Sequence, residues 1–236
     1  LTIDGATIGF ADSRQFTFPT NVKVMPGATL LMRNNAHLTS VSGCPTSMWD
    51  GVKVLSDGTG TGAGSVIVES GGKVSNAFTG ILASDGDPVN PSVDDGSGGG
   101  NITLTDAVFE NNKWDVYRAP HTFDVGAMQT YTRCTFRTNA ALNYSTLNPK
   151  AHVVAQDAGP MTLWGCSFEN TAQSDPANAL TWGMGFFAFH TTAVIERDPV
   201  SLTVPAFTGL YLAVRHHTWT AGRMIKLDEG VFNGCG

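Results

Sequence analysis

Hydrophobic residues recur along this chain in a short fixed pattern that lacks the period of a helix. An apolar residue is followed, after two variable positions, by a small residue and then, after one more, by phenylalanine. Copies stand at residues 104–109, 131–136 and 163–168, with looser copies at 202–207 and 227–232. Their starting points lie 27, 32, 39 and 25 residues apart, so the mean repeat is about 31 residues.

Short segments with strand-like alternation accompany these copies. Alternation precedes or overlaps the repeat at residues 22–24, 66–68, 102–104 and 161–163, and a second short strand is expected at 49–54, 78–81 and 114–116. Earlier in the chain, residues 24–30 and 68–74 carry a related form with a glycine turn. Strands this short cannot bury a hydrophobic face alone, so the repeats must stack on one another.

The stacked repeats predict an all-β fold, a right-handed parallel β-helix of about seven or eight coils. Two interior ladders follow from the pattern, one of small residues and one of phenylalanines. Their members are Ala107, Cys134 and Cys166, and Phe109, Phe136 and Phe168. A propeller or sandwich would show more hairpin turns between paired strands. We expect residues 1–236 to form one domain, a segment of a longer secreted protein.

Composition narrows the range of partners. Charged residues make up 14% of the chain, and 14 basic against 20 acidic residues give a net charge of −6 without a basic cluster. Nucleic acid is therefore not an expected partner. No apolar run reaches the roughly 18 residues of a membrane span. The four cysteines lack metal-ligand spacing, so buried thiols are expected, and Cys134 and Cys166 should remain unlinked.

The order of several motifs resembles that of a known family. Segments 43–54, 75–81, 109–112, 132–136 and 164–170 resemble the parallel β-helix proteins that Bacteroidota export through the type IX secretion system. The resemblance is clearest over residues 20–170. It implies an extracellular or cell-surface protein with further domains, and partners that are other domains of the same chain or other surface proteins. The family implies no single reaction.

Charged residues occupy equivalent positions in successive repeats. Glu110, Arg137 and Glu169 each follow a ladder phenylalanine, and Asp106 and Arg133 share the third repeat position. Alternating sign suits a structural charge ladder, because opposite charges attract across neighbouring parallel strands. The alternative is a catalytic cluster of carboxylates and arginines of the kind that polysaccharide lyases and glycosidases with this fold use. We favour the structural interpretation.

Ca²⁺ is the only cofactor that the sequence suggests. The acidic, glycine-rich segment 85–100 offers Asp85, Asp87, Asp94 and Asp95 as oxygen ligands, although it lacks the order of an EF-hand loop. A solvated loop between coils is the favoured alternative. The six histidines show no metal-ligand spacing.

Aromatic and basic residues suggest a ligand surface. The candidates in the loops are Tyr117, Arg118, His121, Tyr144 and Trp182, since such side chains stack on sugars or anchor protein partners. Alternation with Val116 directs Trp114 inward, toward the core.

No motif of a known catalytic class is present, so a non-catalytic extracellular scaffold or adhesive domain is the favoured function. A carbohydrate-binding module and a polysaccharide lyase or hydrolase are the alternatives, with polysaccharide as the ligand.

Overall fold

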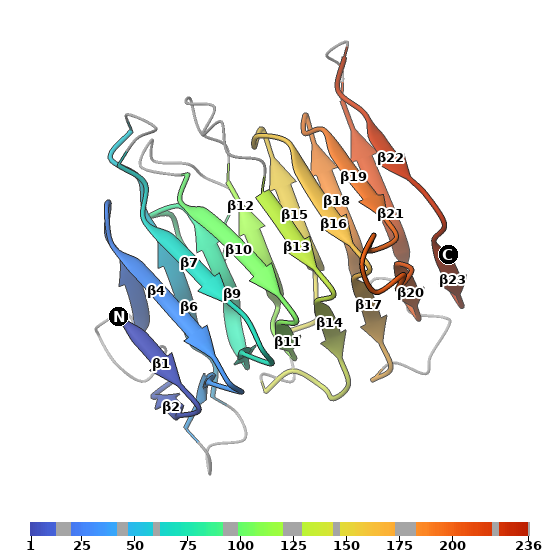
Figure 1. The fold of residues 1–236 in the computed structure, drawn as a ribbon. Coiled ribbons are helices and arrows are strands. Elements are labelled where there is room, and N and C mark those ends of the chain that lie inside the picture. The colour runs from blue at the N-terminus through green and yellow to red at the C-terminus, as the bar shows by residue number, and fades with distance from the viewer. Residues whose placement is uncertain are drawn as a thin grey trace.

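The computed structural model describes residues 1–12, 20–41, 47–58, 62–91, 99–119, 129–143, 147–172, 183–218 and 222–235. In these ranges the chain forms strands and turns without a helix, and the strands assemble into three parallel sheets (Figure 1). Each strand pairs with the equivalent strands of the coils before and after it. The fold is thus a parallel β-solenoid, as the repeat predicts.

The first sheet contains β1 (Thr2–Asp4), β4 (Thr29–Arg33), β7 (Ser65–Val68), β10 (Asn101–Thr105), β13 (Gln129–Thr132), β16 (Met161–Trp164), β19 (Ala193–Glu196) and β22 (Ile225–Leu227). The second contains β2 (Thr7–Phe10), β5 (His37–Ser40), β8 (Lys73–Ser75), β11 (Val108–Glu110), β14 (Thr135–Thr138), β17 (Ser167–Asn170), β20 (Ala206–Thr208) and β23 (Val231–Asn233). The third contains β3 (Asn21–Val24), β6 (Trp49–Val54), β9 (Ala77–Ala83), β12 (Trp114–Arg118), β15 (Ala151–Gln156), β18 (Met184–Phe189) and β21 (Leu212–His217).

The number of turns is slightly lower than expected. The sheets hold eight, eight and seven strands, and the chain completes about six turns between β3 and β21. The predicted parallel β-helix is therefore confirmed, with about six turns in place of seven or eight coils. The strand order in every sheet advances by one coil at a time, so the repeats stack in sequence order.

One residue in the left-handed backbone region makes the corner between the first and second sheets. In successive coils the φ angle there is 54° at Asp106, 51° at Arg133 and 58° at Gly165. This conformation is uncommon for residues with a Cβ, and aspartate tolerates it better than arginine does. The sharp turn lets the next residue face the interior, where Cys134 and Cys166 are both buried.

The phenylalanine ladder lies at one level inside the second sheet. Phe109, Phe136, Phe168, Phe207 and Phe232 pair in register. Their ring centroids are 5.3, 5.1, 4.8 and 5.1 Å apart in chain order. The first four rings are fully buried, whereas Phe232 is 49% exposed. The predicted burial of the first three rings is confirmed, and the two looser copies extend the same ladder.

The thiols of Cys134 and Cys166 are free and buried, as expected. Their sulfurs donate to the carbonyl oxygens of Thr132 and Tyr131, both at 3.4 Å. Burial is the main cause that raises the pKa of Cys134 well above its ordinary value. The expectation of burial does not hold for Cys235, which is free but half-buried, and Cys44 lies outside the described residues.

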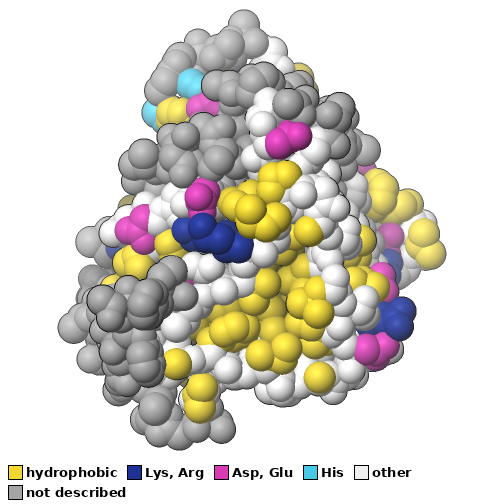
Figure 2. Space-filling view, turned by 90° about the vertical axis from the view of Figure 1, so that its left-hand side faces the viewer, with side chains coloured by type: hydrophobic (Ala, Val, Ile, Leu, Met, Phe, Trp, Pro, Cys, Tyr) yellow, Lys and Arg dark blue, Asp and Glu magenta, His cyan; other side chains and the backbone are white. Residues whose placement is uncertain are grey.

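The core runs the length of the solenoid between the three sheets. Figure 2, which faces the end nearest the N-terminus, shows hydrophobic side chains gathered in the middle of that end. Ile8 in the first coil is 38% exposed, and Leu227 in the last is 39% exposed. Interior side chains are thus less covered in the two terminal coils, although Ile3 in the first coil remains buried at 6% exposed.

Candidate functional site

The outer face of the second sheet carries a three-residue charge network. Glu110 on β11 lies in register with Arg137 on β14. The Lys73 ammonium donates to Glu110 Oε1 at 2.5 Å, and Arg137 Nε donates to Glu110 Oε2 at 2.7 Å. The Glu110 side chain is only 15% exposed. Three adjacent strands thus place one carboxylate between two cations, and Glu169 follows Arg137 in register.

The electrostatics of Glu110 favour its ionised form. Burial is the largest influence on its pKa and raises it, but the hydrogen bonds and charges of Lys73 and Arg137 outweigh burial and lower the pKa below its ordinary value. A general acid at neutral pH needs the opposite shift. The arrangement therefore fits a charge ladder, which is less solvated than the sequence suggests because Glu110 is mostly covered.

A second network lies at the corner between the first and second sheets. Arg133 forms a bidentate pair with Asp106, with Nε 2.8 Å from Oδ1 and Nη2 2.9 Å from Oδ2. Its remaining Nη1 donates to Asp198 Oδ2 at 2.9 Å. Hydrogen bonds from Ser201, and next from Arg133, lower the pKa of Asp198. The candidates Asp106 and Arg133 are thus paired with each other, apart from Glu110 and Arg137.

The described part of the predicted calcium segment is engaged in other contacts. Asp85 Oδ1 accepts a hydrogen bond from Lys23 at 2.8 Å and lies 3.7 Å from Lys53 Nζ. Asp87 Oδ1 accepts the backbone N–H of Val89 at 2.8 Å, which forms a local turn. Ammonium groups therefore occupy the positions next to Asp85 where the sequence suggested a cation.

Asp94 and Asp95 lie outside the described residues. Within the described ranges, no cluster of three or more His, Cys, Asp or Glu side chains is arranged to hold a metal ion.

The two candidates for a ligand surface that the structure describes, Tyr117 and Arg118, are buried. Tyr117 is buried and donates from its hydroxyl to Gln156 Oε1 at 2.9 Å. Arg118 is 1% exposed, and its guanidinium donates to the carbonyl of Gly159. Burial removes Arg118 from contact with a ligand, whereas Tyr117, although buried, borders a small pocket beside Trp114. The remaining candidates His121, Tyr144 and Trp182 lie outside the described residues.

Trp114 lies on the opposite side of the third sheet from the expected one. It packs with a small outer cluster that includes Tyr117, Val154 and Phe187, while Val116 points into the main core. Simple alternation fails here because the intervening Asp115 is buried and hydrogen-bonded within the corner. Trp114 is half-buried and meets Tyr117 edge-on at 5.5 Å, beside a pocket of about 130 Å³ that Asn90 and Pro91 complete.

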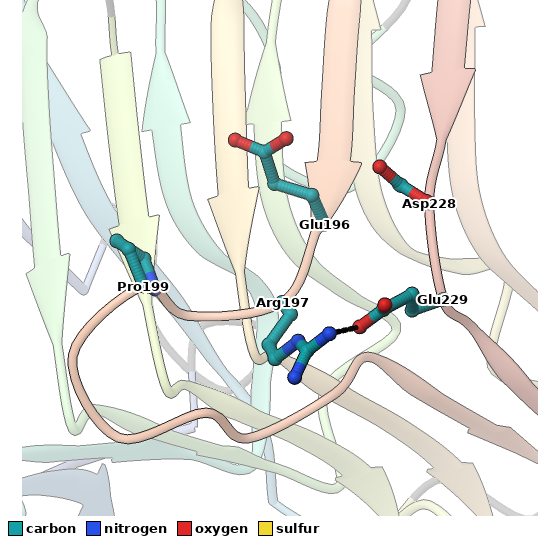
Figure 3. A pocket seen from close by; sticks show the side chains of 5 residues that line it. All are labelled: Glu196, Arg197, Pro199, Asp228 and Glu229. Carbon is teal, nitrogen blue, oxygen red and sulfur yellow. Dashed lines mark ion pairs between the residues drawn. The ribbon is translucent and has the colours of Figure 1, made fainter.

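An open pocket of about 260 Å³ lies near the C-terminal end of the first sheet. It is lined by Glu196 at the end of β19, by Arg197 and Pro199 after it, and by Asp228 and Glu229 after β22 (Figure 3). The carboxylates come from residues about thirty positions apart, and stacking of neighbouring coils brings them together. The sequence pattern did not single out this pocket, because Asp228 and Glu229 occupy variable positions of the last repeat copy, and Glu196, Arg197 and Pro199 lie outside the repeat copies.

Cations already accompany the carboxylates of this pocket. Arg197 forms an ion pair with Glu229, and Lys226 Nζ lies 3.5 Å from Glu196 Oε2 and 3.4 Å from Asp228 Oδ2. Trp164 Nε1 also donates to Glu196 Oε1 at 2.8 Å. The pocket is therefore lined by a network of ion pairs at the surface. Its carboxylates are paired with cations, and these pairs link neighbouring coils.

A buried polar network at the corner between the second and third sheets also escaped the sequence pattern. It joins Asn112, Asp115 and His152 with the backbone of Glu169. Asn112 and Asp115 belong to one coil, whereas His152 and Glu169 come from another, so no short motif contains all four.

Comparison with protein-family models, with curated proteins and with solved structures found no match in any of the three. Over the described part of the chain, no helix has the length and apolar character needed to span a membrane.

Proposed function

We propose that this chain is a non-catalytic scaffold whose β-solenoid presents a polar outer surface for adhesion. The observation that carries the proposal is the pairing of Glu110, which holds two cations from neighbouring strands. A carboxylate with a lowered pKa and two fixed partners suits cohesion between coils better than proton transfer. Asp106 and Arg133 support the same interpretation, because the Arg133 guanidinium donates hydrogen bonds to both carboxylate oxygens of Asp106.

An activity screen tests this proposal. Purified protein is incubated with acidic and neutral polysaccharides, with and without Ca²⁺, and products are measured as new reducing ends and as unsaturated uronic acids. The expected result is no turnover. Turnover by the wild type that disappears in Glu110→Gln, but persists in the control Asp4→Asn, would replace the scaffold by an enzyme. Asp4 is a suitable control because it also forms an arginine pair, with Arg33 at 2.9 Å, on the first sheet.

Carbohydrate binding without turnover is the second candidate function. It is favoured by the half-buried Trp114, whose indole borders an open pocket together with Asn90 and Tyr117. An aromatic ring beside an amide is a common way to hold a sugar ring, which presents both C–H and hydroxyl groups. A glycan array probed with the wild type and Trp114→Ala tests this role, with Tyr211→Ala as the control. Equal binding by all three proteins would remove this pocket as a glycan site.

Location and partners follow from the resemblance to exported β-helix proteins. We propose that the chain belongs to an extracellular or cell-surface protein of the Bacteroidota type IX secretion class. Its partners would then be other domains of a longer polypeptide, other surface proteins or polysaccharide. Sequencing the complete gene tests the export route, because a carboxy-terminal sorting domain is required for it. Protease accessibility of the protein on intact cells tests its location.

A further inference from the structure

The corner between the second and third sheets encloses a chain of hydrogen bonds. Asp115 Oδ1 accepts from Asn112 Nδ2 at 2.8 Å, and Asp115 Oδ2 lies 2.5 Å from His152 Nδ1. The other ring nitrogen of His152, Nε2, lies 3.1 Å from the carbonyl oxygen of Glu169. Asp115 is 1% exposed and His152 is 5% exposed. The network therefore links β12, β15 and β17 away from bulk water.

The donors and acceptors around this network fix its proton count. A backbone carbonyl only accepts, so His152 Nε2 carries a proton. The orientation of Asn112 is set by the N–H of Ala77, which donates to its Oδ1, so Asn112 Nδ2 donates to Asp115. The remaining contact joins His152 Nδ1 to Asp115 Oδ2, and two lone pairs at 2.5 Å would repel. One shared proton must lie between them, and the pair as a whole carries no net charge.

The surroundings oppose loss of that proton. Burial is the largest cause that raises the pKa of Asp115, and the nearby carboxylate of Glu110 raises it further, although His152 and Asn112 act in the opposite direction. From β17, His152 meets the carbonyl of Glu169 and the ring of Phe168, whose centroid is 6.4 Å from that of the imidazole. Deprotonation would leave a buried anion beside another carboxylate, which is costly in a site closed to water.

We propose that Asp115 and His152 form a pH-sensitive lock that holds this corner closed through one shared proton and weakens in alkaline solution. In the unfolded chain, an ordinary histidine loses its proton above about pH 6.5, while aspartate is already ionised. The folded pair keeps one proton more than the unfolded chain there, so stability falls as pH rises until the folded pair itself deprotonates. The unfolding equilibrium constant should increase about tenfold per pH unit in that window.

Denaturant unfolding of the wild type and Asp115→Asn between pH 6.5 and 8.5 tests the lock. An asparagine at this position keeps both contacts without a shared proton, because its amide donates to a neutral His152 Nδ1 while its oxygen still accepts from Asn112. The ratio of the two unfolding constants should therefore change by about 100-fold over the two pH units, since one proton contributes about tenfold per unit. If the unfolding constants of the two proteins changed equally with pH, the proposal would be overturned.

The pair His190–Asp157 supplies a partly exposed control. The atoms His190 Nδ1 and Asp157 Oδ1 lie 3.0 Å apart, and the two side chains are 12% and 42% exposed. The stability of Asp157→Asn should depend on pH as that of the wild type does, because water reaches the Asp157 carboxylate and solvates its charge. If Asp157→Asn changed the pH dependence of the unfolding constant as much as Asp115→Asn does, the lock would not be specific to the buried pair.

A second measurement applies even if Asp115→Asn fails to fold. In nuclear magnetic resonance spectra of the native wild type, the proton between His152 Nδ1 and Asp115 Oδ2 should give a downfield signal at both pH 6 and pH 8. Loss of this signal at pH 8 in protein that is still folded would show that the pair does not retain its proton.

Discussion

The middle and the last coil of the solenoid contain the same residue at the same level of the second sheet. Phe136 stacks between Phe109 and Phe168, with centroid distances of 5.3 and 5.1 Å, and is fully buried. Phe232 stacks on Phe207 at 5.1 Å, yet it is 49% exposed. The local geometry is the same, whereas the burial differs. The contribution of a ladder residue therefore depends on whether coils cover it from both sides, because each coil contacts only its neighbours.

The largest expected effect breaks the ladder in its middle. Phe136→Ala should lower the free energy of unfolding by about 3–5 kcal/mol, because neighbouring coils cannot close the cavity independently. Phe232→Ala should cost only about 1 kcal/mol, since half of its ring already meets water. Denaturant unfolding of both variants measures the difference. Equal losses would show that position along the axis does not set the contribution.

The next largest effect is expected for Asn112, the buried amide at the corner between the second and third sheets. Asn112→Ala removes an acceptor from the N–H of Ala77 and a donor from the carbonyl of Val74, and both groups are buried. The expected loss is about 1–3 kcal/mol, the cost of leaving such groups without partners. Asn139→Ala is the exposed comparison and should cost less, because water replaces its bonds. Thermal or denaturant unfolding distinguishes the two variants.

The charge network of the middle coils should make a smaller, pH-dependent contribution. Glu110→Gln should lower the free energy of unfolding by about 1 kcal/mol at pH 7. This value lies at the upper end of the range for ion pairs that are partly exposed. Because the folded pKa of Glu110 is depressed, this stabilisation is present above the unfolded value of about 4.3 and disappears as pH falls through the folded pKa. Unfolding measured at pH 7 and again below pH 4 checks the sign. A difference between wild type and variant that grows in acid would contradict it.

The smallest effect is chemical and leaves the fold intact. A thiol reagent should label Cys235 within the native protein, while Cys134 and Cys166 should react only after unfolding. Peptide mapping by mass spectrometry assigns each label. Rapid native labelling of Cys134 would mean that the middle coils open as readily as the last one.

Much of the architecture could be predicted from the sequence because it depends on a local repeat. The Phe109, Phe136 and Phe168 level, the buried thiols and the parallel stacking all follow from residues that recur at equivalent positions. The Glu110–Arg137 pairing follows for the same reason, since register along a parallel sheet brings equivalent positions together.

Side-chain direction at irregular positions could not be predicted in this way. Trp114 faces outward because the buried Asp115 interrupts the simple alternation of β12. Arg118 is buried because it lies two residues after the inward-facing Val116, in register with the core residues Ala83 and Ala155. Alternation assumes a regular strand, and a polar residue held inside a corner breaks that assumption.

The sequence by itself determined the repeat, the sheet class and the interior rows, since these depend on periodic hydrophobic burial. Only the tertiary structure decided which polar groups meet outside the repeat positions: Asp115 and His152 are 37 residues apart in the chain, and the second partner of Arg133, Asp198, is 65 residues away. Insertions of unequal length separate these residues in the chain. Their contacts arise from the stacking of coils, which no local spacing encodes.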